Sequence, residues 1–202
     1  MMKLYYRGCL NMIKLYFRGC LNMIKLLINN GASPRAKTET PHKSPMQLAG
    51  AGGHIAVMEE LAKHGYDWRE KDEWGWTLLH EVAAADHAEA IRWVYSRSRC
   101  MTNIQDKLGR TPLLTALIAG AGVETVEELL KNGEDIAEDD DVGRTAAEAS
   151  ILYCSPEVIQ TVLEATKNNE DIEVDVERLE DIAGDHPQPD VVKKIIETVF
   201  VS

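Results

Sequence analysis

Few residues in this chain have both the type and the spacing that catalysis or metal binding requires. The six histidines are His42, His54, His64, His80, His87 and His186. None of them pairs with a cysteine or an acid at the spacing of a zinc site, and no two lie four residues apart. We therefore expect structural roles for the histidines and no bound metal.

The remaining reactive side chains also form no recognisable site. The four cysteines are Cys9, Cys20, Cys100 and Cys154. Because no C-x-x-C pair occurs, reduced thiols in a cytoplasmic or nuclear protein are favoured over a disulfide or metal framework. The acidic run 138–141 lacks the glycine and final glutamate of a calcium loop. Without a phosphate-binding glycine loop or a nucleophile–histidine pair, we expect no cofactor and no enzyme activity.

Charge is distributed unevenly along the chain, whose formal net charge is -11. Residues 1–38 contain seven Lys or Arg and no acid, whereas Glu134–Asp190 contains eighteen acids and three basic residues. The acidic stretch favours either a basic partner or a solvated end cap, and it repels nucleic acid. No segment is long and apolar enough to span a membrane, and Lys3 and Arg7 interrupt any secretory signal.

The strongest pattern in the sequence is an internal repeat. Four Ser or Thr positions begin similar segments and lie 33, 34 and 34 residues apart: Ser44, Thr77, Thr111 and Thr145. A period near 33 residues is typical of stacked helical units that share one interior. The sequence therefore predicts a helical array, and such arrays seldom carry chemistry of their own.

Three of these positions end the same turn motif, D-x-x-G-x-T, at 72–77, 106–111 and 140–145. The aspartate can accept backbone hydrogen bonds, the glycine permits a positive φ, and the threonine is a good helix N-cap. Pro45 and Pro112 follow at a first helical position, where the missing N–H costs nothing. Each unit is predicted to run turn, helix, turn, helix.

These segments resemble the ankyrin repeat, whose signature is G-x-T-P-L-H-x-A-A followed by G-H and V-V-x-x-L-L-x-x-G-A. Residues 44–67 and 72–87 match best, the third segment has one extra residue within 119–123, and Ala146 replaces proline in the fourth. The resemblance implies an all-α ankyrin-repeat solenoid of about five helix-turn-helix units in a single domain, 1–202. The approximate divisions are 1–38, 39–71, 72–105, 106–139, 140–172 and 173–202, with degenerate capping units first and last.

The two ends depart from the repeat. Residues 1–11 and 12–22 are near-identical copies, and we expect residues 12–19 to serve as a makeshift first helix. The apolar side chains crowded there either favour self-association or partner binding, or bury against residues 46–57. At the other end, we expect helices at Val174–Ala183 and Asp190–Val199, separated by Pro187 and Pro189.

The resemblance also implies where a partner binds, because the turn tips and inner faces of first helices form one concave surface. Positions without a structural task lie between Asp and Gly, between Gly and Thr, and late in the first helix; Val142 and Leu152 are among them. From these positions we expect partner contacts at Glu73, Trp74, Trp76, Lys107, Leu108, Arg110, Arg144 and Tyr153.

Trp74 and Trp76 are the main candidates, since a turn tip has no core to fill and large aromatics often anchor interfaces. With Trp68 and Arg110 nearby in register, they could form a hot spot. In the alternative, one indole folds back onto Arg110 or Lys107.

Proteins of this family imply a non-enzymatic protein–protein interaction module that acts as scaffold, adaptor or inhibitor. The alternative is a regulatory or targeting fragment of a larger enzyme or channel. Nucleic-acid binding through residues 1–38 is a weaker hypothesis, because a duplication inflated their basic charge. The expected partner is a protein, and the expected compartment is the cytoplasm or nucleus.

Overall fold

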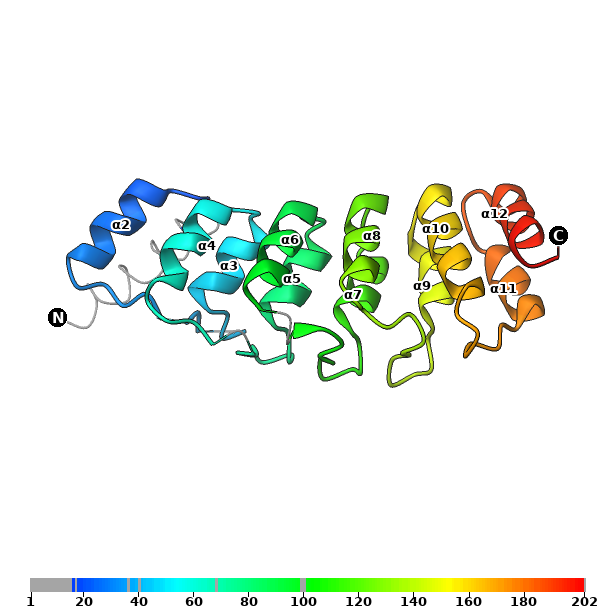
Figure 1. Ribbon diagram of the computed structural model, residues 1–202, viewed down its shortest axis with the longest axis horizontal. Coiled ribbons are helices and arrows are strands. Elements are labelled where there is room, and N and C mark those ends of the chain that lie inside the picture. Colours follow the sequence, from blue (N-terminus) through cyan, green and yellow to red (C-terminus); the bar gives the residue numbers. More distant parts are fainter. Residues whose placement is uncertain are drawn as a thin grey trace. The chain divides into compact units, whose positions relative to one another are not determined.

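The computed structural model describes residues 16, 18–35, 37–39, 41–67, 69–98 and 101–201. Within these ranges every regular element is helical and no β-strand occurs, which confirms the predicted all-α class. The chain divides into two compact units, Met1–Met101 and Thr102–Ser202. Figure 1 shows the helices of each unit as a row of hairpins with the long turns projecting from one edge.

The first unit contains one single helix and two helical hairpins among its described residues. Its helices are α2 (Leu21–Asn29), α3 (Pro45–Ala51), α4 (Ile55–Ala62), α5 (Leu78–Ala84) and α6 (Ala88–Arg97). Helix α3 packs against both α4 and α5, α5 packs against α6, and α2 packs against α4. Each hairpin therefore buries one side on its neighbour, as short helices must.

The second unit contains three hairpins. Its elements are α7 (Pro112–Ile118), α8 (Val123–Lys131), α9 (Ala146–Tyr153), α10 (Pro156–Lys167), α11 (Val176–Ala183), α12 (Pro189–Ile196) and the π-helical η2 (Glu197–Val201). Helix α9 contacts α7, α10 and α11, while α12 contacts α10 and α11. The apolar core of the last two hairpins includes Ile151, Ile159, Leu163, Leu179 and Ile196.

The first helices begin where the sequence places a capping hydroxyl. Thr111 Oγ1 accepts a hydrogen bond from the Leu114 N–H (3.2 Å), and Thr145 Oγ1 accepts one from the Glu148 N–H (3.3 Å). Ser44 does the same for Gln47 at 3.2 Å. Each bond satisfies a backbone donor that has no partner inside its own helix, so the turn ends and the helix starts at a defined residue.

Small residues allow the first helices to approach each other. A Cβ placed on Gly50 in α3 would lie 2.5 Å from Leu78 Cδ1 and 2.9 Å from Val82 Cγ1, both in α5. This distance is shorter than any normal carbon contact, so the glycine sets the spacing of the two hairpins. Close contact between the first helices at this position therefore depends on a residue without a side chain.

The break between the two helices of a hairpin bonds back to the preceding hairpin. His87 Nε2 lies 3.2 Å from the Ala51 carbonyl, and His186 Nε2 lies 3.2 Å from the Cys154 carbonyl. The Cys154 thiol donates to the Leu117 carbonyl at 3.3 Å. These contacts satisfy carbonyls at the ends of first helices, which explains histidine and cysteine in the breaks without any metal.

At the two ends the structure refines the expectations from sequence. Helices α11 and α12 with η2 lie close to the two segments predicted for the last unit. The two helices are separated between Ala183 and Pro189, and Pro189 itself is the first residue of α12, where no N–H is needed. Most of the proposed first helix at 12–19, and the apolar face around it, lies outside the described residues.

Candidate protein-binding surface

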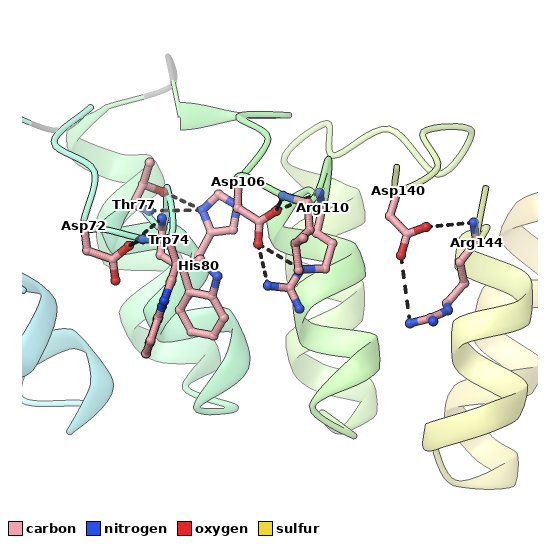
Figure 2. A network of polar contacts seen from close by, with 10 residues as sticks. Asp72, Trp74, Thr77, His80, Asp106, Arg110, Asp140 and Arg144 are labelled. Atoms are coloured by element: carbon pink, nitrogen blue, oxygen red, sulfur yellow. Dashed lines mark hydrogen bonds and ion pairs between the residues drawn. The ribbon is translucent and has the colours of Figure 1, made fainter. Parts of the chain in front are cut away.

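The three turns of the D-x-x-G-x-T motif are closed by their aspartates (Figure 2). Asp72 Oδ1 accepts hydrogen bonds of 2.9 Å from the backbone N–H groups of both Trp74 and Trp76. Asp106 and Asp140 bind the corresponding two N–H groups of their own turns at 2.8–3.1 Å. Because the carboxylate binds the backbone N–H groups from the inner side of the turn, the side chain two residues after the aspartate points away from the protein.

An apolar side chain stands at this outward position in all three turns. Trp74 is 55% exposed, Leu108 is 56% exposed and Val142 is 76% exposed. A single exposed apolar side chain is ordinary on a protein surface, but its recurrence at the same outward position of three turns is a pattern that marks a candidate interaction surface. Trp74 and Leu108 were predicted to contact a partner. Val142 was predicted to lie at a position without a structural task but was not among the predicted contacts, although the repeat spacing aligns it with the other two.

The two tryptophans of the first such turn have different surroundings. Trp76 is only partly exposed, and its ring stacks on His80 with 6.3 Å between centroids and 23° between planes. Lys43 Nζ lies 5.5 Å from the centre of the same ring. Trp76 is thus packed at the base of the turn, whereas the ring of Trp74 is exposed to solvent.

Glu73 lies beside Trp74 and bridges to the preceding turn. Its carboxylate lies 2.5 Å from His42 Nδ1, and its N–H donates to the Pro41 carbonyl at 3.0 Å. The side chain is still 40% exposed, so the carboxylate can meet a partner as well.

Arg110 is held by the aspartate of its own turn. Its Nε and Nη2 atoms donate to Asp106 Oδ2 at 2.8 Å and 2.6 Å, a two-point contact with a planar guanidinium. Burial by itself raises the pKa of the Asp106 carboxyl, but hydrogen bonds from Arg110 and from the Leu108 N–H outweigh burial and lower it. Neighbouring Lys107 is exposed.

Replacing Arg110 by alanine is expected to cost about 1 kcal/mol of unfolding free energy at pH 7, the usual size of a charge-assisted bond at a partly wet site. A carboxyl with a lowered folded-state pKa stabilises the fold above its unfolded pKa of about 3.9, and this contribution is lost as the pH falls through the folded value. Urea unfolding of wild type and Arg110→Ala between pH 7 and pH 3 should show the difference shrinking below about pH 4. A difference independent of pH would contradict this assignment.

In the turn 140–145, the arginine also contacts the last residue of the following helix, α9. The Arg144 guanidinium carbon lies 5.8 Å from the ring centre of Tyr153, and its Nη1 lies 3.9 Å from Asp140 Oδ2. Tyr153 is 45% exposed and the adjacent Leu152 is 37% exposed. The second unit therefore presents exposed apolar groups both at its turn tips and at the end of α9.

Two adjacent turns of the second unit are in direct contact. The Asp141 N–H donates to the Leu108 carbonyl at 3.0 Å, which places the tips carrying Leu108 and Val142 next to each other. A rigid pair of tips presents its apolar groups at a fixed spacing, and this reduces the conformational entropy lost when a partner binds.

The described residues contain no group of three or more His, Cys, Asp or Glu side chains placed to hold a metal ion. Over the same part of the chain, no helix has the length and apolar character needed to cross a membrane.

Stacked helical hairpins joined by aspartate-closed turns define this chain as a helical-repeat protein. The ankyrin-repeat family, described as "Ankyrin repeats (3 copies)", matches residues 12–106. Residues 12–106 therefore consist of ankyrin repeats, as the resemblance implied. Ankyrin repeats are protein–protein interaction modules, generally without catalytic activity.

Several much longer proteins are similar to this chain. An ankyrin repeat and KH domain-containing protein of Caenorhabditis briggsae is 28% identical over 66% of the chain and 5% of its own length. A putative palmitoyltransferase of Danio rerio is 28% identical over 50% of the chain and 16% of its own length. A transient receptor potential cation channel homologue of Caenorhabditis elegans is 28% identical over 46% of the chain and 8% of its own length.

Proposed function

We propose that this chain is a non-enzymatic scaffold, adaptor or inhibitor that binds a partner protein through its turn tips and the inner faces of its first helices. One observation carries the proposal: the same outward position holds an exposed apolar side chain in three successive turns, at Trp74, Leu108 and Val142. Exposed apolar side chains lower solubility and do not stabilise the fold, so contact with a partner accounts for their presence at the tips.

Charged groups around the tips supply the polar rim of the proposed surface. Glu73, Lys107, Arg110 and Arg144 lie in the same turns, and Tyr153 lies at the end of α9 beside Arg144. Arg110 and Arg144 are partly occupied by their own aspartates, so they contribute more to orienting a partner than to affinity. The acidic stretch 134–190 supports a partner with basic character.

The test is affinity capture of partners with wild type beside Trp74→Ala and Leu108→Ala variants, followed by measurement of each partner's Kd. Each variant is expected to weaken binding at least about tenfold, because a centrally buried aromatic or leucine anchor contributes roughly 1.4 kcal/mol or more. The control, Glu89→Ala, changes an exposed residue on the second helix of the Trp74 hairpin and should leave Kd unchanged. Partners retained equally by both tip variants would refute the proposed surface.

The second candidate is that this chain is a regulatory or targeting region of a larger enzyme or channel. The small fraction of each relative's length that the match covers supports it, because most of each of those proteins lies outside the matched segment. A full-length transcript that encodes a catalytic or pore-forming region would decide for this candidate.

A further inference from the structure

The three turn aspartates differ in what binds their second carboxylate oxygen. Asp106 Oδ2 receives two hydrogen bonds from Arg110, and Asp140 Oδ2 lies 3.9 Å from Arg144 Nη1. Asp72 Oδ2 is buried and has no hydrogen-bond partner among the described residues. Figure 2 shows this contrast: interactions reach both oxygens of Asp106 and Asp140 but only one oxygen of Asp72.

The difference follows from one residue. The position between glycine and threonine is arginine in the second unit's turns, at Arg110 and Arg144, and it is Trp76 in the turn of Asp72. An indole carries no charge, so this turn lacks the cation that its counterparts provide for themselves. Asp72 is only 7% exposed, and a buried carboxylate oxygen without a partner is costly.

A lysine of the preceding turn is engaged by a second buried carboxylate. Lys43 Nζ lies 2.6 Å from Glu81 Oε1, and Glu81 is 3% exposed. Burial raises the pKa of Glu81, Lys43 lowers it, and the charge of Asp72 raises it again. Asp72 and Glu81 are therefore two buried carboxyl groups that influence each other, and the Lys43 ion pair is with Glu81.

We propose that the turn 72–77 receives the side chain of one arginine of the partner protein, whose guanidinium binds Asp72 Oδ2 as Arg110 binds Asp106 Oδ2. This inference deepens the proposed function and rests on it. The partner's arginine completes a turn that the other two repeats complete internally.

Arginine fits this place better than lysine for two reasons. The contact between Arg110 and Asp106 shows that this turn geometry accepts a guanidinium at two points, whereas an ammonium would use one. Two indoles, those of Trp74 and Trp76, follow Asp72 in the same turn, and a planar guanidinium stacks on indole faces. The position of Lys43 over the Trp76 ring shows that a cation is already favoured on this face.

Access to the oxygen requires part of the turn to move. Asp72 Oδ2 exposes almost no surface, and the other oxygen of the same carboxylate binds the Trp76 N–H. Binding of a guanidinium must therefore change the environment of the Trp76 indole, which gives the proposal a spectroscopic signature.

The test is a titration of the isotope-labelled full chain with N-acetyl-arginine methylamide, followed through the indole N–H resonances of the tryptophans. The uncharged isostere N-acetyl-citrulline methylamide is the probe control. We expect a saturable shift of the Trp76 resonance with a Kd on the order of millimolar, as one charged contact provides, and at least about tenfold weaker binding of citrulline.

Two variants and one matched control locate the site. Asp72→Asn removes the charge but keeps the oxygen that closes the turn, and Trp76→Arg reproduces the Gly-Arg-Thr sequence of the other two turns. Both variants should fold and lose arginine binding. Binding to Asp72→Asn is followed through the indole N–H resonance of Trp76, and binding to Trp76→Arg through that of Trp74. Glu89→Gln removes an exposed carboxylate from the second helix of the same hairpin and should bind as wild type does.

The arginine inference is overturned by a wild type that shows no saturable shift, by equal binding of citrulline, or by a Trp76→Arg variant that binds normally. An equal loss in Glu89→Gln and Asp72→Asn would also overturn it, because the attraction would then be nonspecific. Partner capture that depends on Trp74 while the arginine probe fails removes this inference and leaves the proposed function standing.

Discussion

Gly109→Ala is expected to lower the free energy of unfolding by about 3 kcal/mol, whereas Gly143→Ala should cost only about 1 kcal/mol. Both glycines hold the same repeat position and have positive φ, +72° for Gly109 and +74° for Gly143. A Cβ on Gly109 would lie 2.8 Å from the backbone nitrogen of Asp141 and 2.6 Å from its Oδ1. The nearest contact at Gly143 is Asp139 Oδ2 at 4.0 Å.

The pair separates two costs that a single glycine substitution would mix. Gly143→Ala measures the strain of a left-handed backbone alone, and Gly109→Ala adds an overlap with backbone that cannot move without opening the contact between two turns. Urea unfolding followed by far-ultraviolet circular dichroism gives both free energies. Equal losses for the two variants would mean that the turns of the second unit are not held together as the Asp141–Leu108 bond indicates.

Leu163→Ala is expected to cost about 3 kcal/mol of unfolding free energy, within the range for leucine truncation in a packed core. Leu163 in α10 is fully buried in the apolar cluster of the last two hairpins, together with Ile159, Leu179 and Ile196. The side chains of this cluster come from α9, α10, α11, α12 and η2, so none can collapse into the cavity without disturbing another contact. The loss should therefore weaken the stacking of α11 and α12 on their neighbours.

The control for Leu163 is Leu152→Ala in the same hairpin, where the side chain is 37% exposed and should lose less than about 1 kcal/mol. Urea unfolding with the same optical readout measures both variants. A loss at Leu163 no greater than that at Leu152 would show that the last hairpins are not stacked through this cluster.

The local features of the repeat were predictable because each depends on neighbours in sequence. The hydroxyl of Thr111 caps a helix through an N–H three residues away, and the Asp106 carboxylate closes a turn within four residues. The outward position of Leu108 follows from that closure. Sequence spacing alone was therefore enough to predict the helices, the turns and the free positions at their tips.

Sequence reasoning could not separate Trp74 from Trp76, because both occupy free positions in the same turn. The difference comes from His80 in the following helix and from Lys43 in the preceding turn, which pack on Trp76 and leave Trp74 exposed. Val142 occupies the same repeat position as Trp74, although its side chain is smaller.

The sequence by itself determined that this is an array of ankyrin hairpins, since the caps, the turn aspartates and the apolar spacing act over four residues or fewer. Only the tertiary structure decided that His87 binds the Ala51 carbonyl and that Gly109 meets Asp141. The physical reason is that each contact depends on a neighbouring repeat, more than thirty residues away along the chain, and repeats of nearly identical pattern differ in which partner their neighbour supplies.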